Sequence, residues 1–128
     1  MTRVVSSMPR GFQAVYSTWW VAAEVSNGGF HQYFYNQGTN WAFMALEGYK
    51  LFGNHERAAL MARAIETFLQ EEAEEPRFPG VTPAQMIEGF VKSREASKLP
   101  ELDRLFYETE GGRAVAYIRA HIDEFVAD

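Results

Sequence analysis

The sequence predicts an all-α protein, a single compact domain of about six or seven helices spanning residues 1–128. Three observations support this fold class. Apolar residues recur at helical spacing along nearly the whole chain, no segment alternates in the manner of a strand, and capping and breaking residues divide the chain into pieces of helix length. With 128 residues and 47% hydrophobic content, the chain can close a core without disulfides or metals.

The first helix follows from an apolar stripe in residues 12–23. The segment 27–29, Asn-Gly-Gly, then predicts a helix stop with positive φ at Gly28, because Asn and Gly tolerate positive φ better than other residues. A short helix over residues 29–36 follows, and the carboxylate of Glu24 could accept hydrogen bonds from the N–H groups at its start. The stripe repeats at i, i+3, i+4, i+7, i+8 and i+11 and consists of Phe12, Val15, Tyr16, Trp19, Trp20 and Ala23.

Two further helices are expected within residues 40–69. Thr39 or Asn40 can cap the first of them. Gly53 and Asn54 separate the pair, because Gly can take the left-handed conformation that ends a helix and Asn can cap the next one. Apolar residues from Ala58 to Leu69 supply the face of the second helix.

The C-terminal half begins after two prolines and a glycine in residues 76–80, which break the chain. Thr82 and Gln85 then form a capping box around Pro83 at the first helical position. A shorter helix is expected near residues 102–106, followed by a last helix after a pair of glycines. We expect burial of Met86, Ile87, Phe90 and Val91 on the first of these three helices and of Val115, Ile118, Ile122, Phe125 and Val126 on the last.

The composition limits the function classes. The absence of cysteine excludes a disulfide framework, a cysteine nucleophile and thiolate metal sites, and it fits a reducing cytoplasm. The N-terminal residues lack the apolar run of a signal peptide, and no segment reaches transmembrane length. We therefore expect a soluble, cytoplasmic protein without a membrane partner.

The net charge of −5 is unevenly distributed. Residues 1–64 contain five Lys/Arg and three Asp/Glu, a balance of +2, whereas residues 65–128 contain seven Lys/Arg and fourteen Asp/Glu, a balance of −7. An acidic half does not favour direct binding of nucleic acid, whose phosphates are neutralised by Lys and Arg. It suits a basic partner instead.

The segment EVSNGGFHQYFYNQGTNW, residues 24–41, is the most distinctive part of the chain. In a structural interpretation its aromatic residues pack two helices together, and Glu24, His31 and Gln32 satisfy buried polar groups. Two alternatives stay open: Glu24 and His31 form an acid/base or metal pair, or exposed aromatic residues bind a ligand or partner. The candidate residues are Glu24, Asn27, Gly28, Gly29, Phe30, His31, Gln32, Tyr33, Phe34 and Tyr35.

Familiar catalytic motifs are absent. His55 and Glu56 do not begin a zinc-protease motif, because Ala59 occupies the position of the second histidine. There is no nucleophile elbow and no phosphate-binding loop, and three scattered histidines make a weak case for a metal. We expect no enzymatic activity, no cofactor and no metal.

Acidic residues of the C-terminal half form a candidate partner surface. Carboxylates one helical turn apart lie roughly 5–6 Å from each other at Cβ, a separation comparable to that of DNA phosphates. Glu71 and Glu75 form a like-charge pair at a helix C-terminus, which costs about a few tenths of a kcal/mol and favours either a function or a merely solvated helix end. The candidates are Glu71, Glu72, Glu74, Glu75, Glu101, Asp103, Glu108, Glu110, Asp123 and Glu124.

The segment NGGFHQYFYN, together with Glu24, resembles the signature of a bacterial all-helical family of unknown function whose best-known type is a DNA-mimic protein. An Ala-rich helix pair that includes Ala58–Leu69 and the later segment LDRLFY, Leu102–Tyr107, are similar to that family as well. The resemblance implies a homodimer whose acidic surface occupies the DNA-binding face of a transcription regulator, with no catalytic activity or cofactor.

Together these observations predict a non-catalytic protein-interaction module that binds a basic DNA-binding regulator through its acidic C-terminal half, without direct contact with nucleic acid. One alternative is a small-ligand or metal-dependent enzyme site around Glu24 and His31. Another is a neutralising partner of a toxin or of another basic protein, which would use the same acidic face.

Overall fold

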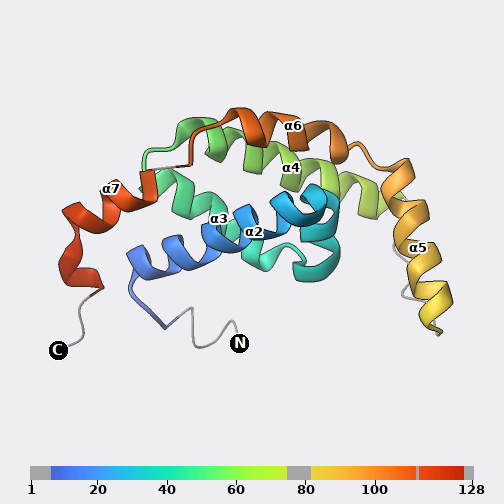
Figure 1. Ribbon diagram of the computed structural model, residues 1–128, viewed down its shortest axis with the longest axis horizontal. Coiled ribbons are helices and arrows are strands. Elements are labelled where there is room, and N and C mark those ends of the chain that lie inside the picture. The colour runs from blue at the N-terminus through green and yellow to red at the C-terminus, as the bar shows by residue number, and fades with distance from the viewer. Residues whose placement is uncertain (1–6, 75–81, 112, 126–128) are drawn as a thin grey trace.

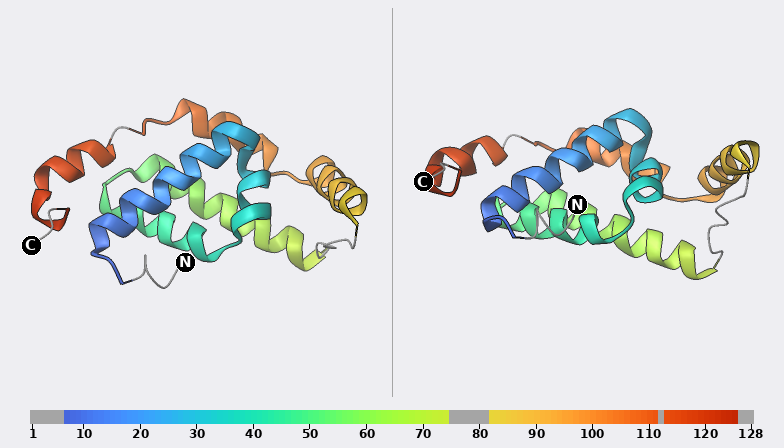
Figure 2. Two further views of the ribbon diagram at one scale, coloured as in Figure 1. Left: turned by 60° about the horizontal axis from the view of Figure 1, so that its bottom comes forward. Right: turned by 90° about the horizontal axis from the view of Figure 1, so that it is seen from below.

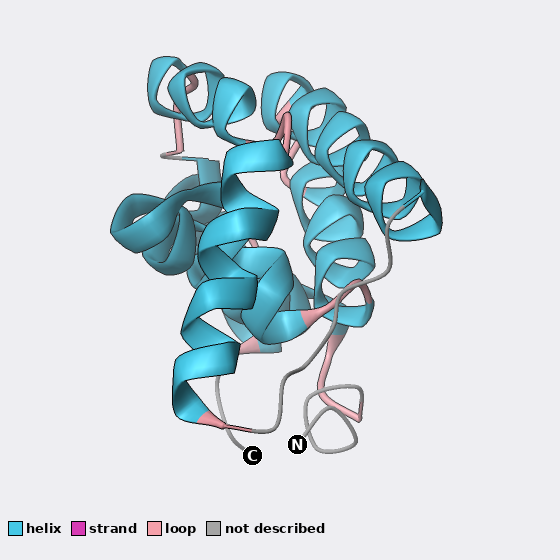
Figure 3. Cartoon of the chain, turned by 90° about the vertical axis from the view of Figure 1, so that its right-hand side faces the viewer, coloured by secondary structure: helices cyan, strands magenta, loops and turns pink. Residues whose placement is uncertain are grey.

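The computed structural model describes residues 7–74, 82–111 and 113–125, and the following description concerns these residues. They form six α-helices and one 3-10 turn without any strand, which confirms the predicted all-α class (Figures 1 and 3). The elements are α2 (Arg10–Gln37), α3 (Asn40–Leu51), α4 (His55–Glu74), α5 (Pro83–Ala96), α6 (Pro100–Glu108), α7 (Arg113–Ala120) and η1 (Ile122–Glu124).

Several helix ends lie where local sequence signals predict them. The hydroxyl of Thr82 accepts from the N–H of Gln85 at 3.1 Å, and the Gln85 side chain accepts from the N–H of Thr82 at 3.1 Å, so the capping box is confirmed. Gly53 has φ 72°, and the Asn54 side chain accepts from the N–H of Arg57 at 3.2 Å, as expected for an end followed by a cap.

The core lies where α2, α3 and α4 pack together and α6 covers them (Figures 1 and 2). Phe34 of α2 stacks on Phe68 of α4 with ring centroids 4.7 Å apart. Phe30 of α2 packs on Phe106 of α6 at 5.7 Å. Because each buried aromatic ring removes a large apolar area from water, these two contacts hold the second half of α2 against both later helices.

Helices α5 and α7 lie at opposite ends of the molecule and contain no buried residue in the described chain (Figures 1 and 2). The predicted burial of Met86, Ile87 and Val91 is therefore wrong, and Ile87 is 66% exposed. Val115 and Ile122 are also exposed, Phe90, Ile118 and Phe125 are only half-buried, and Val126 lies outside the described residues. Periodicity shows that these helices have an apolar face, but each of them meets the core along one side only.

None of the helices in the described residues combines the length and apolar character that crossing a bilayer requires.

Candidate functional site at the helix kink

The predicted corner is a kink within the range of α2, at which two helical segments meet. Within α2, Gly29 has φ 82° and ψ 178°, a conformation that is essentially restricted to glycine. The positive φ therefore belongs to Gly29 and not to Gly28, contrary to the sequence-based expectation. Such a break interrupts the regular backbone hydrogen bonds on either side, as a helix end does.

A carboxylate from α6 binds the backbone at this break. The N–H of Phe30 donates to Oδ1 of Asp103 at 2.9 Å, and a Cβ atom on Gly29 would collide with the same carboxylate. Burial raises the pKa of Asp103 above its ordinary 3.8, although the Phe30 N–H and the Arg94 cation both lower it. Asp103, expected on an acidic partner surface, therefore acts as an internal cap.

Two further side chains bind backbone carbonyls beside the kink. Nη1 of Arg94, at the end of α5, donates to the carbonyl of Gly28 at 2.6 Å. The hydroxyl of Tyr107, on α6, donates to the carbonyl of Val25 at 2.8 Å. These donors lie 66 and 82 positions away in the chain, so the kink depends on long-range contacts. We call this set the kink cluster: Val25, Gly28, Gly29, Phe30, Arg94, Asp103 and Tyr107.

Glu24 does not play the predicted capping role. Its Oε2 accepts from Nε2 of Gln32 at 3.1 Å and from Nδ2 of Asn36 at 3.2 Å. It therefore joins the two halves of α2 across the kink through side chains, while Asp103 binds the backbone.

His31 contacts side chains of α5. Its side chain is only 4% exposed, and Nε2 lies 2.8 Å from Oγ of Ser93 on α5. Its ring meets Phe90 edge-on at 4.9 Å and Tyr35 at 5.9 Å. The contacts described for His31 thus go to α5, whereas those described for Glu24 go to Gln32 and Asn36. Among the described residues, no group of three or more His, Cys, Asp or Glu side chains is placed to hold a metal ion.

The remaining aromatic residues of this segment mostly belong to the core. Phe30, Tyr33 and Phe34 are almost completely buried. Burial raises the pKa of Tyr33, so that its phenol stays neutral. Tyr35 is half-buried against Phe90 of α5, while Asn27 is exposed.

The kink cluster brings together the two segments that distinguish this sequence, residues 24–34 and Leu102–Tyr107. Leu102 and Phe106 of the second segment are buried beside the kink, and Asp103 and Tyr107 bind its backbone. Comparison with known protein families matches residues 6–121 to the DMP19-like protein family. The chain belongs to this family. No match was found among curated proteins or solved structures.

DMP19, after which the family is named, is a DNA-mimic protein. The match extends across all six described helices, so it includes both segments of the kink cluster. The resemblance that the sequence suggested is thereby confirmed at the level of the family. Sequence reasoning located both segments but did not predict that they are in contact. The only signal for this contact was that both segments belong to the same family pattern.

The acidic residues of this DMP19-like chain differ in their exposure. Glu74, Glu101, Glu108, Glu110 and Asp123 are exposed, Glu72 and Glu124 are half-buried, and Glu75 lies outside the described residues. Some of these carboxylates have partners within the chain: Glu108 binds Nε of Arg104 at 3.1 Å, and Glu124 accepts from the Tyr117 hydroxyl at 2.9 Å.

Glu71 differs most from the expectation of a partner surface. Its carboxylate accepts from Oγ of Ser97 at 2.6 Å and from the N–H of Lys98 at 2.8 Å. These bonds connect the end of α4 with the loop between α5 and α6, so Glu71 has a structural role.

Proposed function

We propose that this chain is a non-catalytic, single-domain protein of residues 1–128 that mimics DNA towards a basic DNA-binding regulator in the cytoplasm. The observation that carries the proposal is the match to the DMP19-like family over residues 6–121. This family is non-enzymatic in general. The balance of −7 in residues 65–128 supports a basic partner, since opposite charges steer association.

The exposed carboxylates on α4 and α6 are the proposed contact surface. The two helices run antiparallel and side by side: Glu71 binds the loop before α6, while Arg57 near the start of α4 donates to the Thr109 hydroxyl at 2.9 Å (Figure 1). Glu101 and Glu110 therefore lie at opposite ends of this helix pair. Neither carboxylate forms an ion pair within the described residues, which leaves both available to a partner.

Neutralisation of this surface tests the proposal. Partners captured from a lysate of the source cells on the immobilised chain should be released by duplex DNA. The reason is that the chain and the DNA compete for the same basic face of the partner. Glu101→Gln with Glu110→Gln should weaken the binding of the captured partner about fivefold, which corresponds to roughly 1 kcal/mol of binding free energy. Glu47→Gln with Glu95→Gln removes the same charge from exposed positions on α3 and α5 and should have little effect.

The outcomes separate mimicry from the neutralisation of a toxin. A partner that releases from the chain at high salt but not with duplex DNA would be a basic protein of another kind, such as a toxin. Equal weakening by both pairs of substitutions would contradict a defined contact surface on α4 and α6.

We also propose that two copies of the chain associate through the apolar face of α5. This face consists of Met86, Ile87 and Val91, which are all exposed. An exposed apolar face on a helix is typical of a surface that another protein covers. A homodimer built in this way would leave the carboxylates of α4 and α6 accessible.

A further inference from the structure

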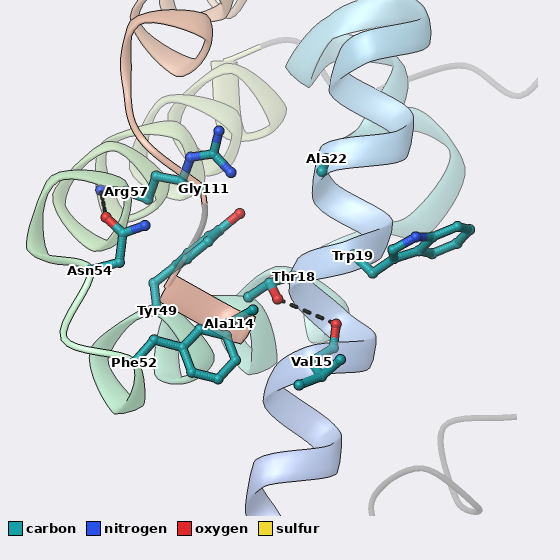
Figure 4. A pocket seen from close by; sticks show the side chains of 10 residues that line it. All are labelled: Val15, Thr18, Trp19, Ala22, Tyr49, Phe52, Asn54, Arg57, Gly111 and Ala114. Atoms are coloured by element: carbon teal, nitrogen blue, oxygen red, sulfur yellow. Dashed lines mark hydrogen bonds between the residues drawn. The ribbon is translucent and has the colours of Figure 1, made fainter. Parts of the chain in front are cut away.

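A pocket of about 180 Å³ lies between α2, the junction of α3 with α4, and α7, away from the kink cluster (Figure 4). Its size is close to that of the engineered protein cavities of roughly 150 Å³ that accept benzene. The walls include Val15, Thr18, Ala22, Tyr49, Phe52 and Arg57. Trp19 borders the pocket, but its indole points away from Tyr49 and Arg57 (Figure 4).

Tyr49 contributes a buried hydroxyl group without a hydrogen bond in the described chain. The side chain is only 4% exposed and lines the pocket. Burial raises the pKa of Tyr49 to about 12, while the nearby Arg57 guanidinium acts in the opposite direction. The group therefore keeps its proton at neutral pH and can donate it to an acceptor that enters the pocket.

Arg57 contributes a cation whose charge is not matched by an acid. Its guanidinium lies 3.9 Å from the Phe106 ring centroid, Nε donates to the Thr109 hydroxyl at 2.9 Å, and Nη2 to the Thr109 carbonyl at 3.4 Å. All these partners are neutral, and Arg57 forms no ion pair within the part of the chain that the structure describes. A half-buried, held guanidinium of this kind attracts a carboxylate.

We propose that this pocket binds a small organic carboxylic acid with a compact apolar ring. The carboxylate accepts from Arg57 and Tyr49, and the ring lies against Val15, Phe52 and Ala114. The apolar walls favour the ring, and the two donors select for the carboxylate, which is the usual division of roles in a small-molecule site. Since Ala114 belongs to α7, the bound acid links this peripheral helix to the core.

The test uses benzoate as the probe and two related compounds as controls. Benzoate should give saturable chemical-shift changes at Tyr49, Arg57 and Ala114 and should raise the thermal midpoint of unfolding. Benzamide, which has the ring without the charge, should bind about tenfold more weakly, and so should acetate, which has the charge without the ring. Equal binding of benzoate and benzamide, or no saturable change with benzoate, would overturn the proposal.

Variants locate the site. Tyr49→Phe removes only the unpaired hydroxyl and keeps the fold, and it should weaken benzoate about tenfold. Ala22→Leu should fill the pocket and abolish binding. Arg57→Gln should weaken benzoate strongly, whereas Arg104→Gln removes the same charge from an exposed position on α6 and should not. Unchanged affinity in both Tyr49→Phe and Ala22→Leu would place the benzoate elsewhere and refute the site. This result is independent of DNA mimicry.

Discussion

At the scale of single residues, Gly29 is constrained in two ways. Its φ of 82° and ψ of 178° are accessible essentially to glycine, and its Cα lies directly against the Asp103 carboxylate. Two requirements therefore meet at one position: an unusual backbone conformation and the absence of a side chain. Gly38 meets only the first requirement. Its backbone has φ 72° and ψ −162°, but a Cβ atom added there would meet no other atom within 4 Å.

Gly29→Ala should lower the free energy of unfolding by about 2 kcal/mol or more, because it adds backbone strain and a collision with Asp103. Gly38→Ala should carry the strain alone and cost less. Urea denaturation of the two variants measures the difference. If the losses are equal, the contact with Asp103 does not constrain Gly29.

Asp103 should make stability depend on pH. Because its folded pKa is raised, the folded state holds the proton more tightly than the unfolded chain does. The stabilisation from this group is therefore fully present below the ordinary value of 3.8 and is lost as the pH rises through the raised pKa.

Thermal unfolding of the wild type and Asp103→Asn tests this dependence. The stability of the wild type relative to the variant should increase as the pH falls from 7 through the raised pKa towards 3.8. A difference that stays constant over this range would show that Asp103 has the same pKa in both states.

At the scale of elements, the two ends of α5 differ in their contacts. Arg94 binds the Gly28 carbonyl and Ser93 binds His31, so the C-terminal part of the helix is connected to α2. Nearer the start of the helix, Ile87 and Val91 are exposed. The helix thus presents an apolar face to solvent, and this face does not contribute to the stability of the monomer.

Ile87→Glu should leave the free energy of unfolding of the monomer within about 0.5 kcal/mol, because the side chain is already exposed. It should also shift a dimer towards the monomer in sedimentation equilibrium. Leu69→Glu introduces the same charge at an exposed apolar position on α4 and serves as the control. Dimers that persist in Ile87→Glu but not in Leu69→Glu would place the interface on α4.

Substitutions at Glu71 and Glu74 should distinguish a structural carboxylate from a surface carboxylate at the end of α4. Glu71→Gln weakens the bonds to Ser97 and Lys98 and should cost about 1 kcal/mol. Glu74→Gln alters an exposed carboxylate and should change stability by less than about 0.5 kcal/mol. Chemical denaturation compares them, and a stabilised Glu71→Gln would mean that charge repulsion outweighs its hydrogen bonds.

At the scale of the whole molecule, the acidic half of the sequence both completes the fold and carries most of the negative charge. Asp103 and Glu71 are used inside the molecule, while Glu101, Glu110 and Asp123 remain exposed. The three ion pairs of the described residues, including that of Lys50 with Glu47, lie between exposed side chains and contribute little. Unscreened repulsion between carboxylates should therefore lower stability.

Raising the salt concentration from about 0.05 M to about 0.5 M NaCl should stabilise the protein modestly, because salt screens this repulsion. Glu101→Gln with Glu110→Gln should reduce the gain. Thermal unfolding across the salt series provides the measurement. A loss of stability at high salt would show that attractive pairs dominate the surface.

Sequence patterns alone predicted the helical class, the capping box at Thr82, the cap at Asn54 and the family to which the chain belongs. These features depend on patterns within a few residues, or on motifs that are recognised as strings. Which carboxylates face inwards and which apolar faces remain uncovered became clear only from the packing of the folded chain. Phe30 and Asp103 are separated by 73 positions, and no local pattern reports such a contact. Periodicity shows that a helix has an apolar face, but the packing of distant segments decides whether another part of the chain covers it.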